Sequence, residues 1–258
     1  MTLIRSRPTY PNWGLEVQKG NVPGQSIVHK YGRNDAIPNG SWAHVNLLGG
    51  ALWQRTAAGT VRVKAGHASD TAGGGGAQAI TIIGIDDNLV EVSESVATAG
   101  ASASSATTAL FWRVYRAYIT PASAGAYSAA NTGVVVIEDS GGSNDLISIG
   151  VEEGQSQFAA YTVPTGKSAY LQSAFITVDA GKAANIRLFT RANFNDVTTP
   201  FEPNRQRLHF DGVLGAVSFK PDTPLGAYPA LTDIWWEAYG GGAASQVSVD
   251  FELLVCDA

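Results

Sequence analysis

The sequence predicts an all-β protein: an antiparallel β-sandwich or jelly roll, with two packed β domains and an extended N-terminal arm. Apolar and polar residues alternate in segments such as 41–47 and 60–65, and this period of two is typical of half-buried strands. Such segments recur at intervals of about 8–12 residues, separated by Gly, Pro, Asn and Asp, which is typical of sandwiches and barrels. Strands and helices do not alternate along the chain, so an open parallel sheet is not expected.

Residues 1–34 are expected to form the arm, because they contain three prolines and four glycines and show no helical period. At most a short strand near 26–31 is expected there. Residues 1–33 contain five basic residues and one acidic residue, a local charge of +4. Since the net charge of the chain is −5, the other 225 residues together carry −9. A basic arm of this kind either docks on a neighbouring acidic body or is a solvated tail.

Two blocks of strands follow the arm. We expect them to form two sandwich domains, 35–155 and 156–258, with one large interleaved sandwich as the alternative. In the first block the alternation predicts strands at 41–47, 60–65, 79–85, 89–96, 110–119, 133–138 and 145–151. In the second block it predicts strands at 158–163, 169–178, 184–191, 207–210, 216–219, 233–239 and 246–254. The small and polar segment 97–108 is expected to be a surface loop or a set of weak strands.

Four consecutive glycines, Gly73, Gly74, Gly75 and Gly76, suggest a phosphate-binding loop at first sight. Nucleotide-binding loops of that kind lead into a helix, whose N-terminal amides and dipole hold the anion. Here the buried strand 79–85 follows instead. The glycines are therefore expected to form a loop that either meets a neighbouring subunit or turns tightly at a corner of the sandwich.

The titratable residues show no catalytic or metal-binding pattern. The four histidines lack the spacing of a chelating pair, and no Gly-x-Ser-x-Gly nucleophile elbow occurs. The run Asp86-Asp87-Asn88 is interpreted as a turn, because Asp and Asn side chains bond their own backbone in turns. We expect no catalytic residue, metal or cofactor. A sugar-binding platform is the alternative use of the aromatic side chains, whose candidates are Trp42, Trp53, Trp112, Tyr115, Trp235 and Trp236.

Composition limits the class of protein and its partners. Charged residues make up 15% of the chain, below the roughly 25% of an average soluble domain, which suits either a partner-covered surface or an ordinary sandwich. The negative net charge argues against a nucleic-acid partner. One cysteine, Cys256, fits assembly in a reducing cytoplasm. The N-terminus lacks the apolar core of a signal peptide and no run is long enough for a membrane span, so no membrane partner is expected.

Several motifs resemble those of virion structural proteins from tailed bacteriophages. In the first block these are DTAGGGGA (70–77), GID (84–86), SESV (93–96), FWRV (111–114) and AGAYSAANTG (124–133). In the second block YTVPTGK (161–167), TDIW (232–235) and VSVDF (247–251) resemble the closing jelly roll of such proteins. The resemblance covers about 35–258 and leaves the arm without a counterpart.

The resemblance implies a non-enzymatic virion protein, assembled in the host cytoplasm. Its most direct form is a capsid cement or decoration protein that stabilises the phage head by bridging neighbouring capsid subunits. The partners would be the major capsid protein or other virion proteins, and the chain would form a homo-oligomer, with a trimer favoured. Under this hypothesis an interface is formed by Leu3, Ile4, Arg5, Arg7, Tyr10, Trp13 and Leu15 of the arm and by Gly73, Gly74, Gly75 and Gly76.

Two other functions compete with this one. A head–tail or tail-fibre component, or a carbohydrate-binding module for a host receptor, would use aromatic pairs exposed on one sheet face. A hydrolase on a β scaffold would need two carboxylates, or a Ser–His pair, converging in a deep cleft.

Overall fold

Strands dominate the chain, and every pair of strands within its sheets is antiparallel. The structure is a computed structural model that describes residues 12–48, 53–120, 130–179, 181–241 and 244–258. Among these residues lie four sheets and one short helix, α1 (Trp13–Gln18). The predicted all-β, antiparallel class is confirmed.

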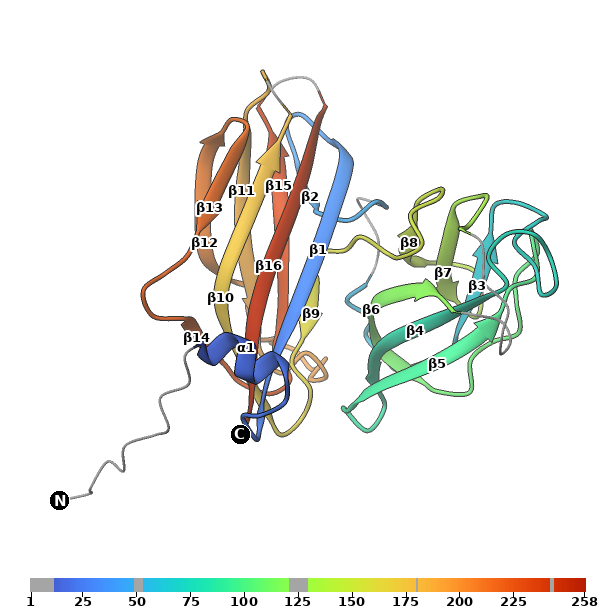
Figure 1. Cartoon of the computed structure of the whole chain (residues 1–258), viewed down its shortest axis with the longest axis horizontal. Helices are drawn as coiled ribbons and strands as arrows, with labels where there is room; N and C mark the ends of the chain where they lie inside the picture. Colours follow the sequence, from blue (N-terminus) through green and yellow to red (C-terminus); the bar gives the residue numbers. More distant parts are fainter. Residues whose placement is uncertain (1–11, 49–52, 121–129, 180, 242–243) are drawn as a thin grey trace.

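Two five-stranded sheets face each other and form a β-sandwich (Figure 1). The first has the order β1-β16-β10-β13, with β14 also paired to β10. Its strands are β1 (Gln25–Ile37), β10 (Lys167–Val178), β13 (Ala216–Phe219), β14 (Leu225–Tyr228) and β16 (Ser245–Asp257). The second has the order β12-β11-β15-β2, with β9 also paired to β15. Its strands are β2 (Trp42–His44), β9 (Ala160–Thr162), β11 (Ala184–Arg191), β12 (Arg205–Val213) and β15 (Asp233–Gly240).

The sandwich strands pair in a nested order. The first strand pairs with the last, β1 with β16, and β2 pairs with β15. Inside these lie the pairs β10 with β13 and β11 with β12. Further pairings of β10 with β16 and of β11 with β15 join the nested pairs into two sheets. The eight strands therefore pair as the two arms of one long hairpin that is folded into two sheets.

Strand alternation fills the space between the two sheets. In β11 buried and partly exposed residues alternate without exception, as expected for a strand with one face on a core. Ile186 and Leu188 point inward and belong to the same core as Ile176, Phe251 and Trp236 from the other strands. Burying a side chain of this kind stabilises the fold by about 1.5–3 kcal/mol. This core holds the two sheets together.

A second unit, called here the insertion, occupies residues 53–157 and lies beside the sandwich (Figure 1). It contains the sheets β3-β7-β8 and β5-β4-β6 around a second core, which also includes Ala160 of β9 and Trp235 of β15. The strands are β3 (Val61–Ala65), β4 (Ala79–Asp86), β5 (Glu91–Ala97), β6 (Phe111–Ile119), β7 (Val135–Asp139) and β8 (Asp145–Ile149). The chain leaves the sandwich after β2 and returns at β9, and both of these strands pair with β15. The insertion thus interrupts one edge of a sandwich sheet.

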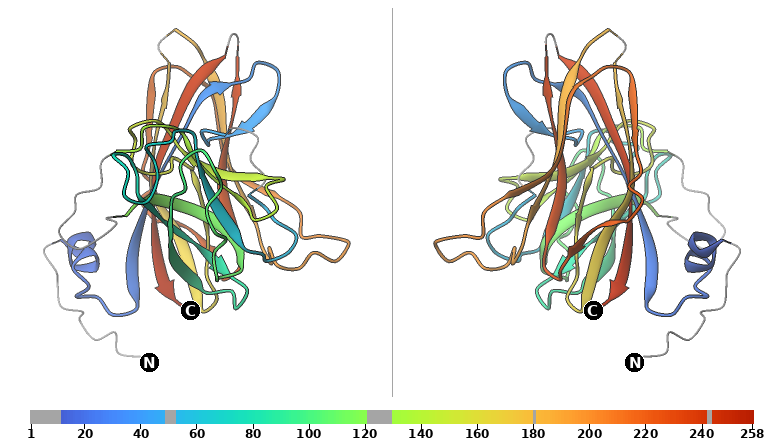
Figure 2. Two further views of the ribbon diagram at one scale, coloured as in Figure 1. Left: turned by 90° about the vertical axis from the view of Figure 1, so that its right-hand side faces the viewer. Right: turned by 90° about the vertical axis from the view of Figure 1, so that its left-hand side faces the viewer.

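This arrangement divides the chain differently from the expected domains 35–155 and 156–258. Residues 25–37, expected within the arm or at its end, form a long strand paired with β16, and β2 also belongs to the sandwich. Sequence periodicity predicts only a short strand near 26–31 here, because three of the four buried positions of β1 are Lys30, Gly32 and Asn34 rather than apolar residues; the fourth is Ile37. The first three positions contact the insertion and its flanking segments; for example, Lys30 bonds the backbone oxygen of Tyr115. Helix α1 lies beside β1 (Figure 2).

A buried ion pair joins the insertion to the sandwich. Arg113 of β6 and Asp233 of β15 both have fully buried side chains. Arg113 Nη2 donates to Asp233 Oδ2 at 3.0 Å, and Nε donates at 3.1 Å to Oδ1 and 3.2 Å to Oδ2. Thr162 of β9 donates its hydroxyl to Asp233 Oδ1 at 2.7 Å. The carboxylate therefore has three side-chain donors from two parts of the molecule, as a buried charge requires.

The remaining donor group of Arg113 is also hydrogen-bonded, and aromatic rings lie close to the guanidinium. Its Nη1 donates to the backbone oxygens of Arg55 and Trp112, both at 2.9 Å. The guanidinium carbon lies 4.6 Å from the ring centroid of Phe194 and 5.7 Å from that of Trp53. Phe194 belongs to the core of the sandwich and Trp53 to that of the insertion. Arg113 therefore contacts both cores.

We expect Arg113→Met to lower the free energy of unfolding by about 3–5 kcal/mol, because it leaves the Asp233 carboxylate buried without its main partner. The double variant Arg113→Met/Asp233→Leu should recover part of that loss, since it removes both charges. Urea unfolding measures both. The control is Arg205→Met at the exposed pair Arg205–Glu202 (3.8 Å), which should cost less than about 1 kcal/mol. Equal, small losses in all variants would contradict this role.

Candidate functional site

The arm residues expected at an interface fall into two groups. Trp13 and Leu15 lie on α1 and are 37% and 45% exposed. The helix begins at Asn12, whose Oδ1 accepts a hydrogen bond from Leu15 N at 3.1 Å, and Val17 anchors it by being buried. The remaining predicted residues lie outside the described residues: Leu3, Ile4, Arg5, Arg7 and Tyr10.

Most of the positive charge counted in the arm is used within the chain. Lys19 pairs with Glu16 at 2.9 Å. Lys30 is buried, and its ammonium group donates to a backbone oxygen of the insertion. Arg33 pairs with Glu153 of the insertion at 2.5 Å. The predicted docking role therefore rests on Arg5 and Arg7, which lie outside the described residues.

The glycine loop is built around the buried side chain of Asp70. Asp70 Oδ1 accepts hydrogen bonds from the backbone N–H groups of Ala77 and Thr132, both at 2.9 Å, and Oδ2 accepts one from Gly133 at 2.8 Å. A carboxylate that accepts three backbone hydrogen bonds fixes the segments that supply them. The loop is therefore held to the segment before β7.

The four glycines have different roles in this loop. A Cβ on Gly76 would lie 2.2 Å from Asp70 Oδ1, and one on Gly74 would lie 2.3 Å from the backbone oxygen of Ser69. Gly73 has a positive φ of +78°, whereas a Cβ on Gly75 would meet nothing within 4 Å. The loop turns tightly, as one of the two expectations had it. Gly73 and Gly75 are also exposed.

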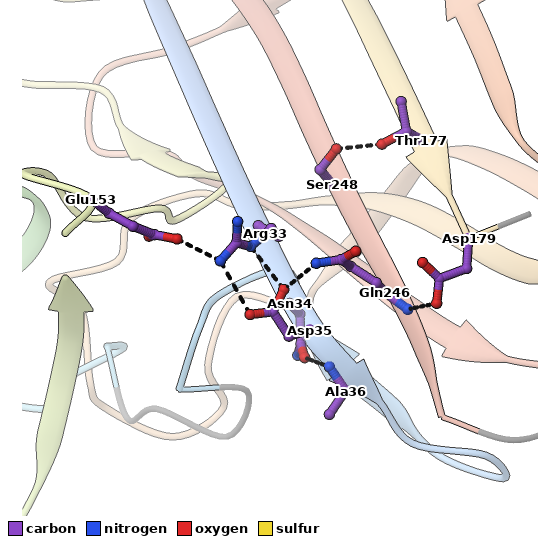
Figure 3. Close-up of polar contacts among 9 residues, drawn as sticks. All are labelled: Arg33, Asn34, Asp35, Ala36, Glu153, Thr177, Asp179, Gln246 and Ser248. Carbon is purple, nitrogen blue, oxygen red and sulfur yellow. Dashed lines mark hydrogen bonds and ion pairs between the residues drawn. The ribbon is translucent and has the colours of Figure 1, made fainter. Parts of the chain in front are cut away.

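A polar groove of about 280 Å³ crosses the outer face of the first sandwich sheet. Arg33 of β1 reaches both Glu153 and Asp35 there, and Gln246 of β16 bonds Asp35 (Figure 3). The backbone N–H of Gln246 donates to Asp179 at 3.0 Å. Arg33 thus pairs within the chain and fastens β1 to the insertion through Glu153.

An aromatic platform lies on the outer face of the second sandwich sheet and is centred on Trp42 of β2. The Arg187 guanidinium carbon lies 3.7 Å from the Trp42 ring centroid, and the rings of Tyr239 and His209 lie 5.5 Å and 5.8 Å from it. Arg187 donates to Glu237 Oε2 from Nε at 2.9 Å and from Nη2 at 2.7 Å. Both donors share this one carboxylate oxygen, and the pair holds the guanidinium over the Trp42 ring.

Glu237 holds the side chains of the platform in position through its hydrogen bonds. Its Oε1 accepts a hydrogen bond from Trp235 Nε1 at 2.8 Å and lies 3.6 Å from His44 Nε2. Burial alone would raise the pKa of Glu237, but hydrogen bonds from His44, Trp235 and Arg187 outweigh burial and lower the pKa to about 2. The carboxylate therefore stays charged at neutral pH and keeps Arg187 in place.

The other aromatic candidates are packing residues. Trp53, Trp235 and Trp236 are at most 1% exposed. The rings of Trp235 and Trp236 belong to different cores, that of the insertion and that of the sandwich, as alternation along a strand requires. The alternation predicts a strand that contains Trp235 and Trp236, but it gives no sign that Trp42 meets an arginine and a tyrosine.

The polar candidates of the sequence are structural too. Asp86 Oδ1 accepts from Asn88 N at 2.9 Å and from Val90 N at 3.0 Å, which confirms the expected turn. Within the described residues, no three His, Cys, Asp or Glu side chains are grouped so as to hold a metal ion. Within the same residues, no helix has the length and apolar character to cross a membrane.

Comparison with known proteins yields weak similarities. No protein-family model and no curated protein matches the chain. Similar solved structures come from infectious bursal disease virus. The Gt strain structure is 11% identical, covering 93% of this chain and 76% of that chain, with a TM-score of 0.21. The VP2 subviral particle is 10% identical (90% and 72% covered, TM-score 0.21), and the T=1 particle is 12% identical (90% and 69%, TM-score 0.23). Similarity at this level carries no inference about this chain.

We expect Gly76→Ala to lower the free energy of unfolding by about 1–3 kcal/mol, because the new methyl group overlaps the Asp70 carboxylate and displaces it from its donors. The matched control is Gly75→Ala, where the methyl group meets open space, and its effect should be under about 1 kcal/mol. Urea unfolding measures both variants. Equal stability of the two would show that the loop does not depend on the Asp70 contacts.

Proposed function

We propose that the chain is a non-enzymatic structural protein of a virus particle, in the form of a capsid cement or decoration protein of a tailed phage. The nested strand pairing, β1 with β16 around β2 with β15, β10 with β13 and β11 with β12, carries the proposal. It fits a jelly roll, a fold that serves in viral capsids, lectins and cupins. The fold does not choose among these functions, and the phage-like motifs favour the first.

The use of the buried charges supports a structural role. Asp70, Arg113 and Asp233 are fully buried, and their hydrogen bonds go to other parts of the same chain. Catalytic groups are instead left able to reach a substrate. The strongest polar groups of this chain hold loops and units in position, which suits a protein whose task is a rigid shape.

The arm is the proposed link to the neighbouring subunit. Trp13 and Leu15 are exposed on a helix fixed beside β1, and aromatic anchors dominate many protein interfaces. Eleven residues precede Asn12, and a chain of that length reaches at most about 40 Å. The partner would be the major capsid protein or another virion protein, and a homo-oligomer with a trimer favoured belongs to the proposal.

Particle binding by arm variants tests this function. We expect Trp13→Ser/Leu15→Ser, and separately deletion of residues 2–11, to weaken cosedimentation with phage heads that lack the protein by about tenfold or more. Urea unfolding should show an intact body in both, because the deletion stops before α1 and β1. A deletion that reaches residue 30 would remove about half of β1, so it could not separate loss of the arm from loss of the fold.

The matched control is Leu214→Ser, which changes a leucine that is 62% exposed on the turn between β12 and β13. It should bind heads as the unchanged protein does. Unchanged binding of both arm variants would overturn the proposed role of the arm. Failure of the unchanged protein itself to bind any head would overturn the cement function.

Carbohydrate binding is the second candidate, and the platform around Trp42 favours it. The Trp42 indole has the Arg187 guanidinium over its ring and Tyr239 beside it, and such a cluster of aromatic and hydrogen-bonding side chains is a candidate contact for a sugar ring. Binding on a glycan array that is lost in Trp42→Ala, together with no binding to heads, would establish this function in place of the first.

A further inference from the structure

A cleft of about 460 Å³ lies where the insertion meets the sandwich. Its walls come from β1 on one side, from β4, β5 and β6 on the other, and from the segment that leads into β9. This volume is within the range of small-molecule sites. The polar groove and the aromatic platform lie on outer sheet faces, whereas this cleft draws residues from both units of the chain.

Lys30 of β1 places a buried amine in this cleft. The residue is 6% exposed, and its Nζ donates to the backbone oxygen of Tyr115 at 2.6 Å and lies 5.0 Å from the centroid of the Tyr115 ring. Among the carboxylates of the described residues none forms an ion pair with it. An ammonium group has three donors, so two are left after the bond to Tyr115.

Arg116 of β6 lines the same cleft. Its guanidinium carbon lies 5.5 Å from the centroid of the Tyr118 ring, and within the described residues it too has no ion pair with a carboxylate. Burial first, and then the charge of Arg116, lower the pKa of Lys30 to about 7, while Glu91 acts in the opposite direction. The charge of Arg116 therefore disfavours the ammonium form of Lys30 within the cleft.

The one carboxylate of the cleft lining is already engaged. Glu91 of β5 accepts a hydrogen bond from the Tyr115 hydroxyl. Burial, with the charge of Glu91, raises the pKa of Tyr115 and of Tyr161 above the ordinary value, so both phenols remain neutral. The cleft therefore offers cationic and neutral donors together with aromatic walls.

We propose that this cleft binds a small organic anion, whose carboxylate or phosphate oxygens accept hydrogen bonds from Lys30 Nζ and the Arg116 guanidinium. Its body lies against the rings of Tyr31 and Tyr161, because the cleft is larger than a bare oxyanion needs. Lys30 and Arg116 face one carboxylate of the lining, Glu91, so an anion in this position supplies the counter-charge that remains. Since β1 and β6 belong to different units, the same ligand contacts the sandwich and the insertion.

Binding should be linked to proton uptake. An anion favours the ammonium form of Lys30, so the complex holds more protons than the free protein near neutral pH, and affinity should rise as pH falls from about 9 to about 6. The charged and titratable groups that face Lys30 are Glu91 from β5, Tyr115 and Arg116 from β6, Tyr161 from β9, and its neighbours His29 and Tyr31 on β1. His29 is paired with Asp250 at 2.6 Å, so His29→Gln should keep the pH dependence.

Isothermal titration calorimetry of the full chain tests the proposal with three probes. These are phenylacetate, which stays ionised throughout the pH range, phenyl phosphate, and the neutral 2-phenylethanol. We expect at least one anion to bind about tenfold or more tightly than the alcohol, because hydrogen bonds to charged groups are strong. Which anion binds distinguishes a carboxylate from a phosphate ligand. Two buffers with different ionisation enthalpies report the proton uptake.

Three variants assign the binding to the cleft. Lys30→Met and Arg116→Gln should each weaken the anion by about tenfold or more, and Lys30→Met should also abolish the proton uptake. Arg116 is exposed, so that variant keeps the test valid even if Lys30→Met disturbs folding. Lys64→Met, at an exposed lysine on β3, is the control. Absence of binding by both anions, equal binding of the alcohol, or binding unchanged by both cleft variants would overturn the proposal.

Discussion

The buried pair of Arg113 and Asp233 is the interaction on which the arrangement of the molecule depends. Desolvating two charges costs several kcal/mol per ion, and their attraction offsets that cost only with good geometry and further hydrogen bonds. This site supplies both, through the bidentate contact and the bonds from Thr162 and to the backbone of Arg55. A buried pair of this kind is better at fixing orientation than at adding stability. It fixes β6 of the insertion against β15 of the sandwich.

Other features follow from that placement. Because β2 and β9 both pair with β15, the insertion starts and ends at one sheet edge and lies beside β1. The cleft around Lys30 exists only because β1 and β6 face each other there. The platform around Trp42 lies on β2, the strand after which the chain leaves the sandwich for the insertion. The polar groove on the opposite sheet adds a second connection to the insertion through Arg33 and Glu153.

Sequence reasoning succeeded where one strand face is apolar and failed where it is not. The alternation of 184–191 predicted β11 to the residue, and the glycine run was recognised as a loop before a strand. Of the long strand β1 only a short stretch near 26–31 is expected, because Lys30, Gly32 and Asn34 occupy three of its four buried positions. Arg113 and Asp233 are 120 residues apart, and nothing local marks either as the partner of the other. The cleft was missed for the same reason.

We propose that the chain uses a jelly-roll body and an anchored arm as a permanent part of a virus particle. Quantitative mass spectrometry of purified virus particles tests this proposal most directly. The account predicts that the chain is present at a fixed stoichiometry with the major capsid protein and stays with the particles through repeated purification. Its absence from purified particles, while it is abundant in the infected cell, would contradict the claim.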